Sequence, residues 1–211
     1  MKRVGITQRV EHIVSYGERR DCLDQRWSEL AMHLELIPVP LPNIMPEAVP
    51  DLLDSLELDC FILSGGNSLS SLEPQAKDAA PERDAFEESL LTCARERKIP
   101  CLGICRGMQM INYYFGGKMV PCRGHVATRH SLLVEKDYEH LLPTEVNSFH
   151  GYSLPSTELA KVLRPIAVDL EGHIEAFEHL SEKITGIMWH PEREKTFHAQ
   201  DLLLLKKALE L

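Results

Sequence analysis

The sequence is short of basic residues and has no long apolar run. It contains 23 Lys and Arg residues against 32 Asp and Glu residues, which gives a net charge of −9. Because an acidic surface repels nucleic acid and anionic lipid, we do not expect a broad polyanion-binding face, but net charge leaves a single basic pocket open. No stretch reaches the length of a membrane span, and the first residues lack the apolar core of a signal peptide. The sequence therefore predicts a cytoplasmic protein that binds neither nucleic acid nor membrane.

Regular cysteine and histidine spacings are also missing. The six cysteines include no CxxC pair, and the ten histidines are scattered along the chain without a ligand spacing. Disulfide frameworks and zinc sites show such spacings in sequence. We therefore expect no disulfide framework, no metal site and no cofactor. The chain also lacks internal repeats, low-complexity tracts and linkers, so we expect one domain over residues 1–211.

Short apolar runs that alternate with amphipathic stretches are typical of an α/β protein. Strands are predicted at residues 3–7, 36–40, 60–63, 101–104, 131–134, 145–149, 162–168, 173–176 and 184–189. Helices are predicted at residues 21–33, 50–56, 81–98, 105–115 and 201–209. Helical crossovers in the first half imply parallel strands, and the closely spaced later strands imply antiparallel additions. The expected fold is a three-layer α/β/α arrangement with a mostly parallel central sheet.

The most informative segment surrounds Cys105, which follows a predicted strand and precedes a predicted helix. Gly103 and Gly107 flank it at two residues on each side. Glycines at these positions remove the side chains that would collide on a tight strand-to-helix turn, as in a nucleophile elbow. The start of the helix would favour a thiolate at Cys105. A buried cysteine in an ordinary βα turn is the alternative interpretation of this segment alone.

A thiol nucleophile needs a base, and the segment Trp189-His190-Pro191-Glu192 supplies a candidate. His190 follows an apolar strand, at the edge where open α/β sheets place their sites. Glu192 is close enough in sequence to reach the other imidazole nitrogen and to fix its tautomer.

Together these segments resemble the class I glutamine amidotransferase-like superfamily, and within it the free-standing γ-glutamyl hydrolases. Further segments that match in order are Leu63-Ser-Gly-Gly66, Val146-Asn-Ser-Phe-His-Gly151, Glu171-Gly-His-Ile-Glu-Ala176 and Gly186-Ile-Met-Trp-His190. The resemblance implies that Cys105 is the nucleophile, His190 the general base and Glu192 the orienting acid. The amide would be cleaved through a glutamyl-thioester intermediate, and its hydrolysis would release glutamate.

The same resemblance implies roles for the residues around the nucleophile. The backbone N–H groups of Gly66 and Arg106 would form the oxyanion hole. Residues that would contact the glutamyl group are Gln109, Asn147, Ser148 and Phe149. Ser148 and His150 are equally compatible with ordinary strand positions.

Two segments indicate the leaving group of the γ-glutamyl amide. They are the first thirty residues and Gly124-His-Val-Ala-Thr-Arg-His130. Both segments resemble γ-glutamyl-CDP-amidate hydrolases, which act in capsule phosphoramidate biosynthesis. A pocket for the leaving group and its phosphates would then be formed by Arg9, Arg19, Arg20, Arg123, Arg129 and His150, because guanidinium pairs bidentately with phosphate oxygens. Alternatively, most of these arginines are solvated surface residues.

Two other functions stay open on the sequence alone. One is hydrolysis of a γ-glutamyl amine or peptide, of the γ-glutamyl-γ-aminobutyrate type. The other is a glutaminase that delivers ammonia to a synthase partner, which the sequence favours less because it needs a docking surface. A non-catalytic binding protein is disfavoured by the intact Cys105, His190 and Glu192. A homo-oligomer is compatible with the sequence.

Overall fold

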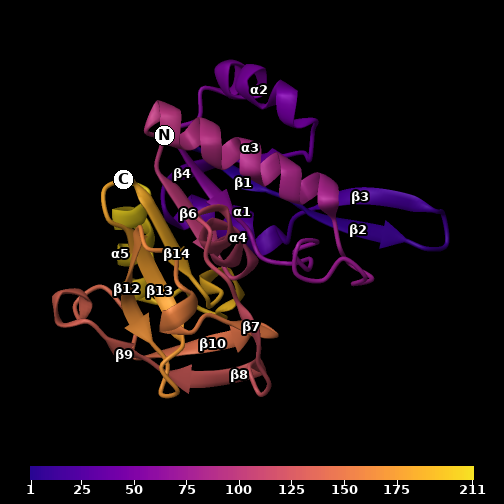
Figure 1. Ribbon diagram of the computed structural model, residues 1–211. Coiled ribbons are helices and arrows are strands. Elements are labelled where there is room, and N and C mark those ends of the chain that lie inside the picture. Colours follow the sequence, from indigo (N-terminus) through magenta and orange to yellow (C-terminus); the bar gives the residue numbers. More distant parts are fainter.

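The computed structural model describes residues 1–211 and is built around an eight-stranded sheet (Figure 1). The strands, in their order across the sheet, are β4 (Leu36–Leu41), β1 (Lys2–Thr7), β5 (Cys60–Leu63), β6 (Cys101–Ile104), β14 (Ile184–Ile187), β13 (Ile174–His179), β12 (Leu163–Val168) and β9 (Leu133–Val134). All pairings from β4 to β14 are parallel, and those from β14 to β9 are antiparallel.

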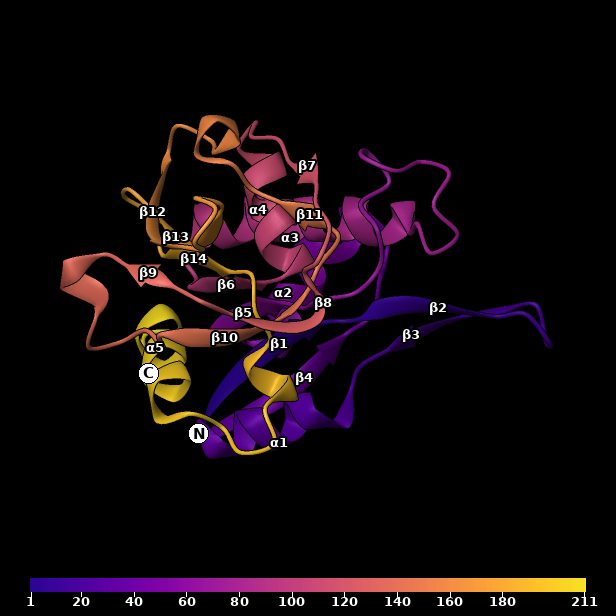
Figure 2. The same ribbon diagram turned by 90° about the horizontal axis from the view of Figure 1, so that it is seen from below.

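Helices cover both faces of this sheet (Figure 2). One face carries α1 (Gln25–His33) and α5 (Ala199–Ala208), and the other carries α2 (Val49–Leu56), α3 (Pro81–Arg97) and α4 (Arg106–Tyr114). Short 3₁₀ helices are η1 (Pro46–Ala48), η2 (Lys136–Tyr138), η3 (Ser156–Glu158) and η4 (Pro191–Arg193). Each face has its own buried apolar cluster between helices and sheet. The predicted three-layer α/β/α fold with a mostly parallel sheet is therefore confirmed. None of the helices has the length and apolar character needed to cross a bilayer.

Three strand pairs lie outside the central sheet. They are the hairpin β2 (Arg9–Ile13) with β3 (Glu18–Cys22), the pair β8 (Val126–Ser131) with β10 (Glu145–Phe149), and the pair β7 (Val120–Pro121) with β11 (Tyr152–Ser153). The hairpin projects from the body as an arm, and the β8–β10 pair lies beyond the antiparallel half of the sheet (Figure 1). We call the β8–β10 pair the small sheet.

The structure corrects the sequence prediction in two segments. The helix expected from residue 21 begins at Gln25, because the side chain of Asp24 caps it by accepting a hydrogen bond from Arg26 N–H at 2.9 Å. The residues before it form the hairpin, whose β3 strand has almost no buried side chain and so carries no apolar alternation. The strand at residues 145–149 pairs with β8 instead of extending the central sheet, and β14 is parallel to β6.

Candidate active site

Three adjacent parallel strands end at the same edge of the sheet. Leu63 of β5 is in register with Gly103 of β6, and Ile104 of β6 with Ile187 of β14. The residues that follow these strands therefore lie side by side, at the edge where open α/β sheets place their sites. They are the Ser64–Gly66 loop, Cys105 and His190.

Cys105 occupies a strained turn between β6 and α4. Its φ angle is +51°, a region that non-glycine residues rarely adopt and that persists where surrounding structure enforces it. Its N–H donates a 2.8 Å hydrogen bond to Ile187 O. A Cβ on Gly107 would lie 2.0 Å from Leu63 O, and one on Gly103 would lie 2.5 Å from the Gly107 carbonyl carbon. The flanking glycines thus let α4 pack directly on the strand ends.

His190 is fixed by Glu192 on one side and is open on the other. Nδ1–H donates to Glu192 Oε1 at 2.6 Å, while the buried Nε2 has no hydrogen-bond partner of normal geometry. A Cβ on Gly65 would lie 2.7 Å from His190 Cε1 and 3.7 Å from Cys105 Cβ. The imidazole and the thiol therefore flank the same glycine, with the free ring nitrogen available to the thiol.

Cys105 and His190 shift each other's pKa. Burial alone would lower the pKa of His190, but the neighbouring Cys105 and Glu192 outweigh it and raise that pKa to about 9. Burial alone would raise the pKa of Cys105, but His190 outweighs it and brings that pKa below the usual range of a thiol. Both directions favour a thiolate and imidazolium pair.

Two backbone N–H groups beside the thiol are free to bind an oxyanion. Neither the N–H of Gly66 nor that of Arg106 donates to another group of the chain. Arg106 is the first residue of α4, where N–H groups have no partner within the helix. Gly66 has a φ angle of +85°, which glycine adopts at little cost.

A buried cluster of charged side chains, which the sequence did not predict, contacts the two segments that carry the N–H groups of Gly66 and Arg106. Arg83 is fully buried and donates to Ser64 O at 2.7 Å and to Gly66 O at 2.6 Å. The side chain of Arg106 forms ion pairs with Glu87 and Asp84. Burial alone would raise the pKa of Glu87, but Arg106 and Arg83 outweigh it and keep that pKa low. Arg83 on α3 gave no sequence signal beyond its place in a charged helix.

A cleft of about 460 Å³ opens in front of Cys105. Predicted residues that line it are Arg106, Gln109, Phe149, His150 and Gly66. The ring of Phe149 also stands edge-on to His190, with centroids 5.8 Å apart. The structure thus brings Gln109 and Phe149 to the same cleft as Cys105.

The side chains of Asn147 and Ser148 are already engaged within the protein. Asn147 Oδ1 accepts from His190 N–H at 2.9 Å, and its Nδ2–H donates to His190 O at 2.8 Å. Ser148 Oγ donates to His125 O at 2.8 Å. Asn147 therefore holds the backbone of His190, and direct glutamyl contacts from these two residues are limited to main-chain groups.

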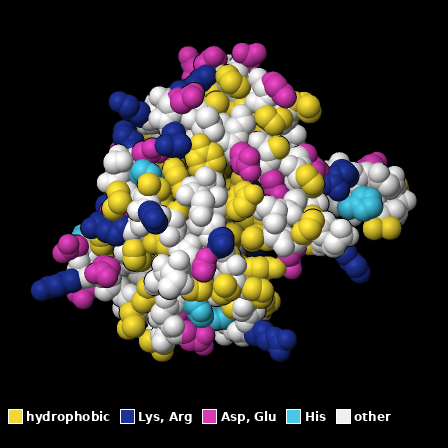
Figure 3. All heavy atoms as spheres, in the orientation of Figure 1, with side chains coloured by type: hydrophobic (Ala, Val, Ile, Leu, Met, Phe, Trp, Pro, Cys, Tyr) yellow, Lys and Arg dark blue, Asp and Glu magenta, His cyan; other side chains and the backbone are white.

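The five arginines assigned to a leaving-group pocket are not gathered in one place. Arg19 and Arg20 are consecutive on β3 and so point to opposite faces, and Arg129 pairs with Glu145 and Glu194. Arg123 is exposed. Lys and Arg side chains are scattered over the face in Figure 3. Most of these arginines fit the alternative of surface residues.

Arg9 differs from the other four because its side chain lies against the Ser64–Gly66 loop. A Cβ on Gly66 would lie 2.9 Å from Arg9 Cδ. Arg9 shares a small pocket with Gly65, Glu192 and Arg193. The Arg193 guanidinium carbon lies 4.5 Å from the Phe149 ring centroid. Arg193 was not among the predicted site residues, although its position directly after the His-Pro-Glu segment could have indicated it.

Known proteins similar to this chain share its family and its fold. Residues 3–192 match the model of the family described as Peptidase C26. The gamma-glutamyl-CDP-amidate hydrolase of Campylobacter jejuni is 37% identical over 194 residues, 90% of each chain. The gamma-glutamyl-gamma-aminobutyrate hydrolase of Escherichia coli O157:H7 is 28% identical over 90% of this chain and 86% of its own. The crystal structure of a glutamine amidotransferase from Thermotoga maritima superposes with a TM-score of 0.63 at 18% identity, over 90% of this chain and 76% of that one.

Proposed function

The chain belongs to the peptidase C26 family and hydrolyses C–N amide bonds, and we propose that Cys105 attacks the carbonyl of a γ-glutamyl amide. The observation that carries this proposal is the buried arrangement of Cys105, His190 and Glu192 at the ends of adjacent strands. The His190–Glu192 hydrogen bond and the free Nε2 give the acid and base functions that a thiol nucleophile needs.

The reaction then runs in two halves. The thiolate of Cys105 adds to the amide carbon, and the oxyanion that forms accepts hydrogen bonds from the N–H groups of Gly66 and Arg106. His190 donates its Nε2 proton to the leaving nitrogen, the C–N bond breaks, and a glutamyl thioester remains on Cys105. His190 next removes a proton from water, which attacks the thioester and releases glutamate with the thiolate restored.

The favoured leaving group is a cytidine diphosphate amidate. The support is the 37% identity over 90% of the chain to a gamma-glutamyl-CDP-amidate hydrolase. Arg9 and Arg193 line a pocket that adjoins the cleft across the Gly65-Gly66 loop. Two guanidinium groups at the rim of the cleft would pair with the diphosphate oxygens. This replaces the five-arginine pocket with a smaller one.

The test is a panel of γ-glutamyl compounds offered to the purified protein without ATP or partner. γ-Glutamyl-CDP-amidate, γ-glutamyl-γ-aminobutyrate, a γ-glutamyl dipeptide and glutamine are compared by mass spectrometry of glutamate and leaving group. We expect the nucleotide to be cleaved fastest, and Cys105→Ala to cleave nothing. Fastest cleavage of the aminobutyrate conjugate would favour that substrate class instead. Turnover of glutamine alone, stimulated by a synthase, would identify a glutaminase, and no glutamate from any compound would contradict the proposal.

A separate variant tests whether Arg193 binds the phosphates of the leaving group. Arg193→Gln should raise KM for γ-glutamyl-CDP-amidate about tenfold, because one charge-assisted contact to phosphate is lost. The same variant should change KM for γ-glutamyl-γ-aminobutyrate much less, since that leaving group has no phosphate. An equal rise in KM for both substrates would show that Arg193 does not bind the phosphates of the nucleotide.

A further inference from the structure

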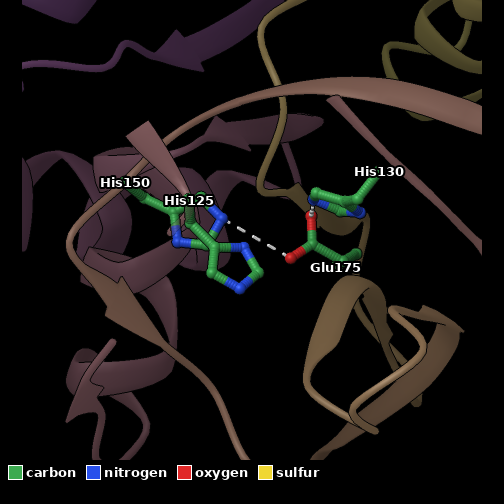
Figure 4. A group of neighbouring side chains, drawn as sticks. All are labelled: His125, His130, His150 and Glu175. Atoms are coloured by element: carbon green, nitrogen blue, oxygen red, sulfur yellow. Dashed lines mark ion pairs between the residues drawn. The ribbon is translucent and has the colours of Figure 1, made fainter. Parts of the chain in front are cut away.

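Three histidines and a glutamate from three segments of the chain lie close together, and one of them, His150, also lines the cleft (Figure 4). His125 precedes β8, His130 lies on β8, His150 follows β10, and Glu175 lies on β13 of the central sheet. One ligand atom from each lies within 4.8 Å of all the others. None of these four residues has a role in the bond cleavage proposed for Cys105, His190 and Glu192.

The polar atoms that face one another in this group have no hydrogen-bond partners. They are His125 Nδ1, His130 Nε2, His150 Nε2 and both carboxylate oxygens of Glu175, and all are buried. Unpartnered buried polar atoms each cost about 1–3 kcal/mol, and more where a charge is involved. Five such atoms, on four side chains whose ligand atoms lie within 4.8 Å of one another, indicate that something binds between them.

The separations match a metal ion better than direct contacts. His130 Nε2 and His150 Nε2 each lie 3.6 Å from an oxygen of Glu175, which is too long for a hydrogen bond. Ligand atoms at about 2.1 Å from a tetrahedral zinc ion lie about 3.4 Å from one another. Protonation of His150 would neutralise Glu175 but would leave His125 Nδ1 and His130 Nε2 unpartnered.

Surrounding groups already hold the ring of His150 and the backbone of His125. His150 Nδ1 lies 2.9 Å from Tyr152 O, and because a carbonyl only accepts, Nδ1 carries the proton and Nε2 is left with its lone pair. Metal-bound histidines usually have their second nitrogen held in this way. Ser148 Oγ donates to His125 O at 2.8 Å and so fixes the backbone at His125.

A second group, formed by His125, Asp169 and His173, is a weaker candidate. Asp169 Oδ1 already accepts from the N–H groups of Glu171 at 2.9 Å and His173 at 2.8 Å. Its Oδ2 lies 3.0 Å from His173 Nδ1. A carboxylate satisfied by three donors has little left to offer an ion, in contrast to Glu175.

We propose that His125, His130, His150 and Glu175 bind one divalent transition-metal ion, for which zinc is the best match. Imidazole nitrogens and a carboxylate are ligands that zinc accepts, and four protein ligands make a closed, structural site. The ion would join the small sheet to β13 of the central sheet. It would thereby hold the wall of the cleft that carries Phe149 and the Asn147 contact to His190.

The first test measures zinc in the purified protein after incubation with zinc chloride and removal of the excess. We expect about one zinc per chain for the wild type, and less than one tenth of that for His130→Ala and for Glu175→Gln. The matched control is His173→Ala, which removes a histidine of the weaker group and should keep about one zinc. Loss with His173→Ala but not with His130→Ala would overturn the assignment, and so would retention of zinc by both ligand variants.

A second measurement needs no variant to fold. Cobalt chloride added to the metal-free wild type should give the strong visible absorption of four-coordinate cobalt, and zinc should abolish it. Circular dichroism spectra of His130→Ala and Glu175→Gln that match the wild type would show that loss of metal is not loss of fold. A wild type that shows neither the cobalt absorption nor more than a tenth of an equivalent of zinc would contradict the proposal.

Discussion

Two buried histidine–glutamate pairs lie near the same cleft, and they are built differently. At the strand-end edge, His190 and Glu192 share a 2.6 Å hydrogen bond that leaves Nε2 free toward the thiol. At the small sheet, His150 and Glu175 stand 3.6 Å apart without a hydrogen bond, and two more histidines face the same carboxylate. The first geometry suits proton transfer and the second suits coordination. The same residue types thus serve different chemistry according to which nitrogen is held and by what.

The largest expected effect separates the two pairs directly. His190→Gln should lower kcat on a γ-glutamyl substrate by about 10⁴-fold, because the acid and base of both half-reactions are lost. His150→Gln should lower kcat far less, by about ten- to a hundredfold, because it acts on the cleft wall. Zinc content should show the opposite order, intact in His190→Gln and lost in His150→Gln. Steady-state kinetics and metal analysis on the same preparations check both.

Equal losses of activity in the two variants would break the comparison, since His150 would then belong to the catalytic machinery. A full zinc content in His150→Gln would also contradict the comparison, since His150 would then not be a metal ligand.

The second expected effect concerns how tightly each region is packed. Gly107→Ala should lower the free energy of unfolding by about 3 kcal/mol, because its Cβ would lie 2.0 Å from Leu63 O, a backbone atom that cannot move aside cheaply. Gly151→Ala is the matched change beside the small sheet, where a Cβ meets nothing within 4 Å. It should change stability by less than about 1 kcal/mol. Urea unfolding of both variants measures the difference, and similar values would contradict this account of the nucleophile turn.

The same contrast explains what the sequence could predict. Cys105, His190 and Glu192 sit in short contiguous segments, where a strand end and a turn fix the geometry locally. The fold class was predictable for the same reason, because β5, β6 and α3 carry their own periodicity or apolar runs.

Features that depend on tertiary contact were not predictable. The four residues of the proposed metal site have no regular spacing, and the chain alone does not show that β8 folds back on β10 next to β13. Arg83 is a buried arginine in a helix of mixed charge, and nothing local marks it as buried. The exposed β2–β3 hairpin lacks apolar alternation, so a pattern search assigns part of it to the following helix.

A smaller effect should follow from cutting the link between the small sheet and the nucleophile edge. Asn147→Ala removes the two hydrogen bonds that clamp the backbone of His190 at 2.8 and 2.9 Å. We expect kcat to fall by about ten- to a hundredfold with little change in KM, because the base is displaced while the cleft is intact. Asn43→Ala, which removes an amide that bonds to Gln8 and Asp21, serves as the control and should leave kcat within about twofold. A change in KM alone for Asn147→Ala would assign this residue to substrate binding instead.

The smallest expected effect is a shift in the pH dependence of kcat/KM. Replacing Glu192 should cause it, and replacing Glu175 should not. The pKa of Cys105 is lowered and that of His190 is raised to about 9, so the thiolate and imidazolium pair exists above the lowered pKa of Cys105 and below about pH 9. The rate kcat/KM should rise with pH as the thiolate forms and fall near pH 9, where His190 loses the proton that the leaving nitrogen needs. Glu192→Gln removes a charge that raises the pKa of His190, so the alkaline limb should move down by about one pH unit. Glu175→Gln should leave that limb near pH 9 even if the rate falls, and an equal shift in both variants would show that the two pairs titrate as one system.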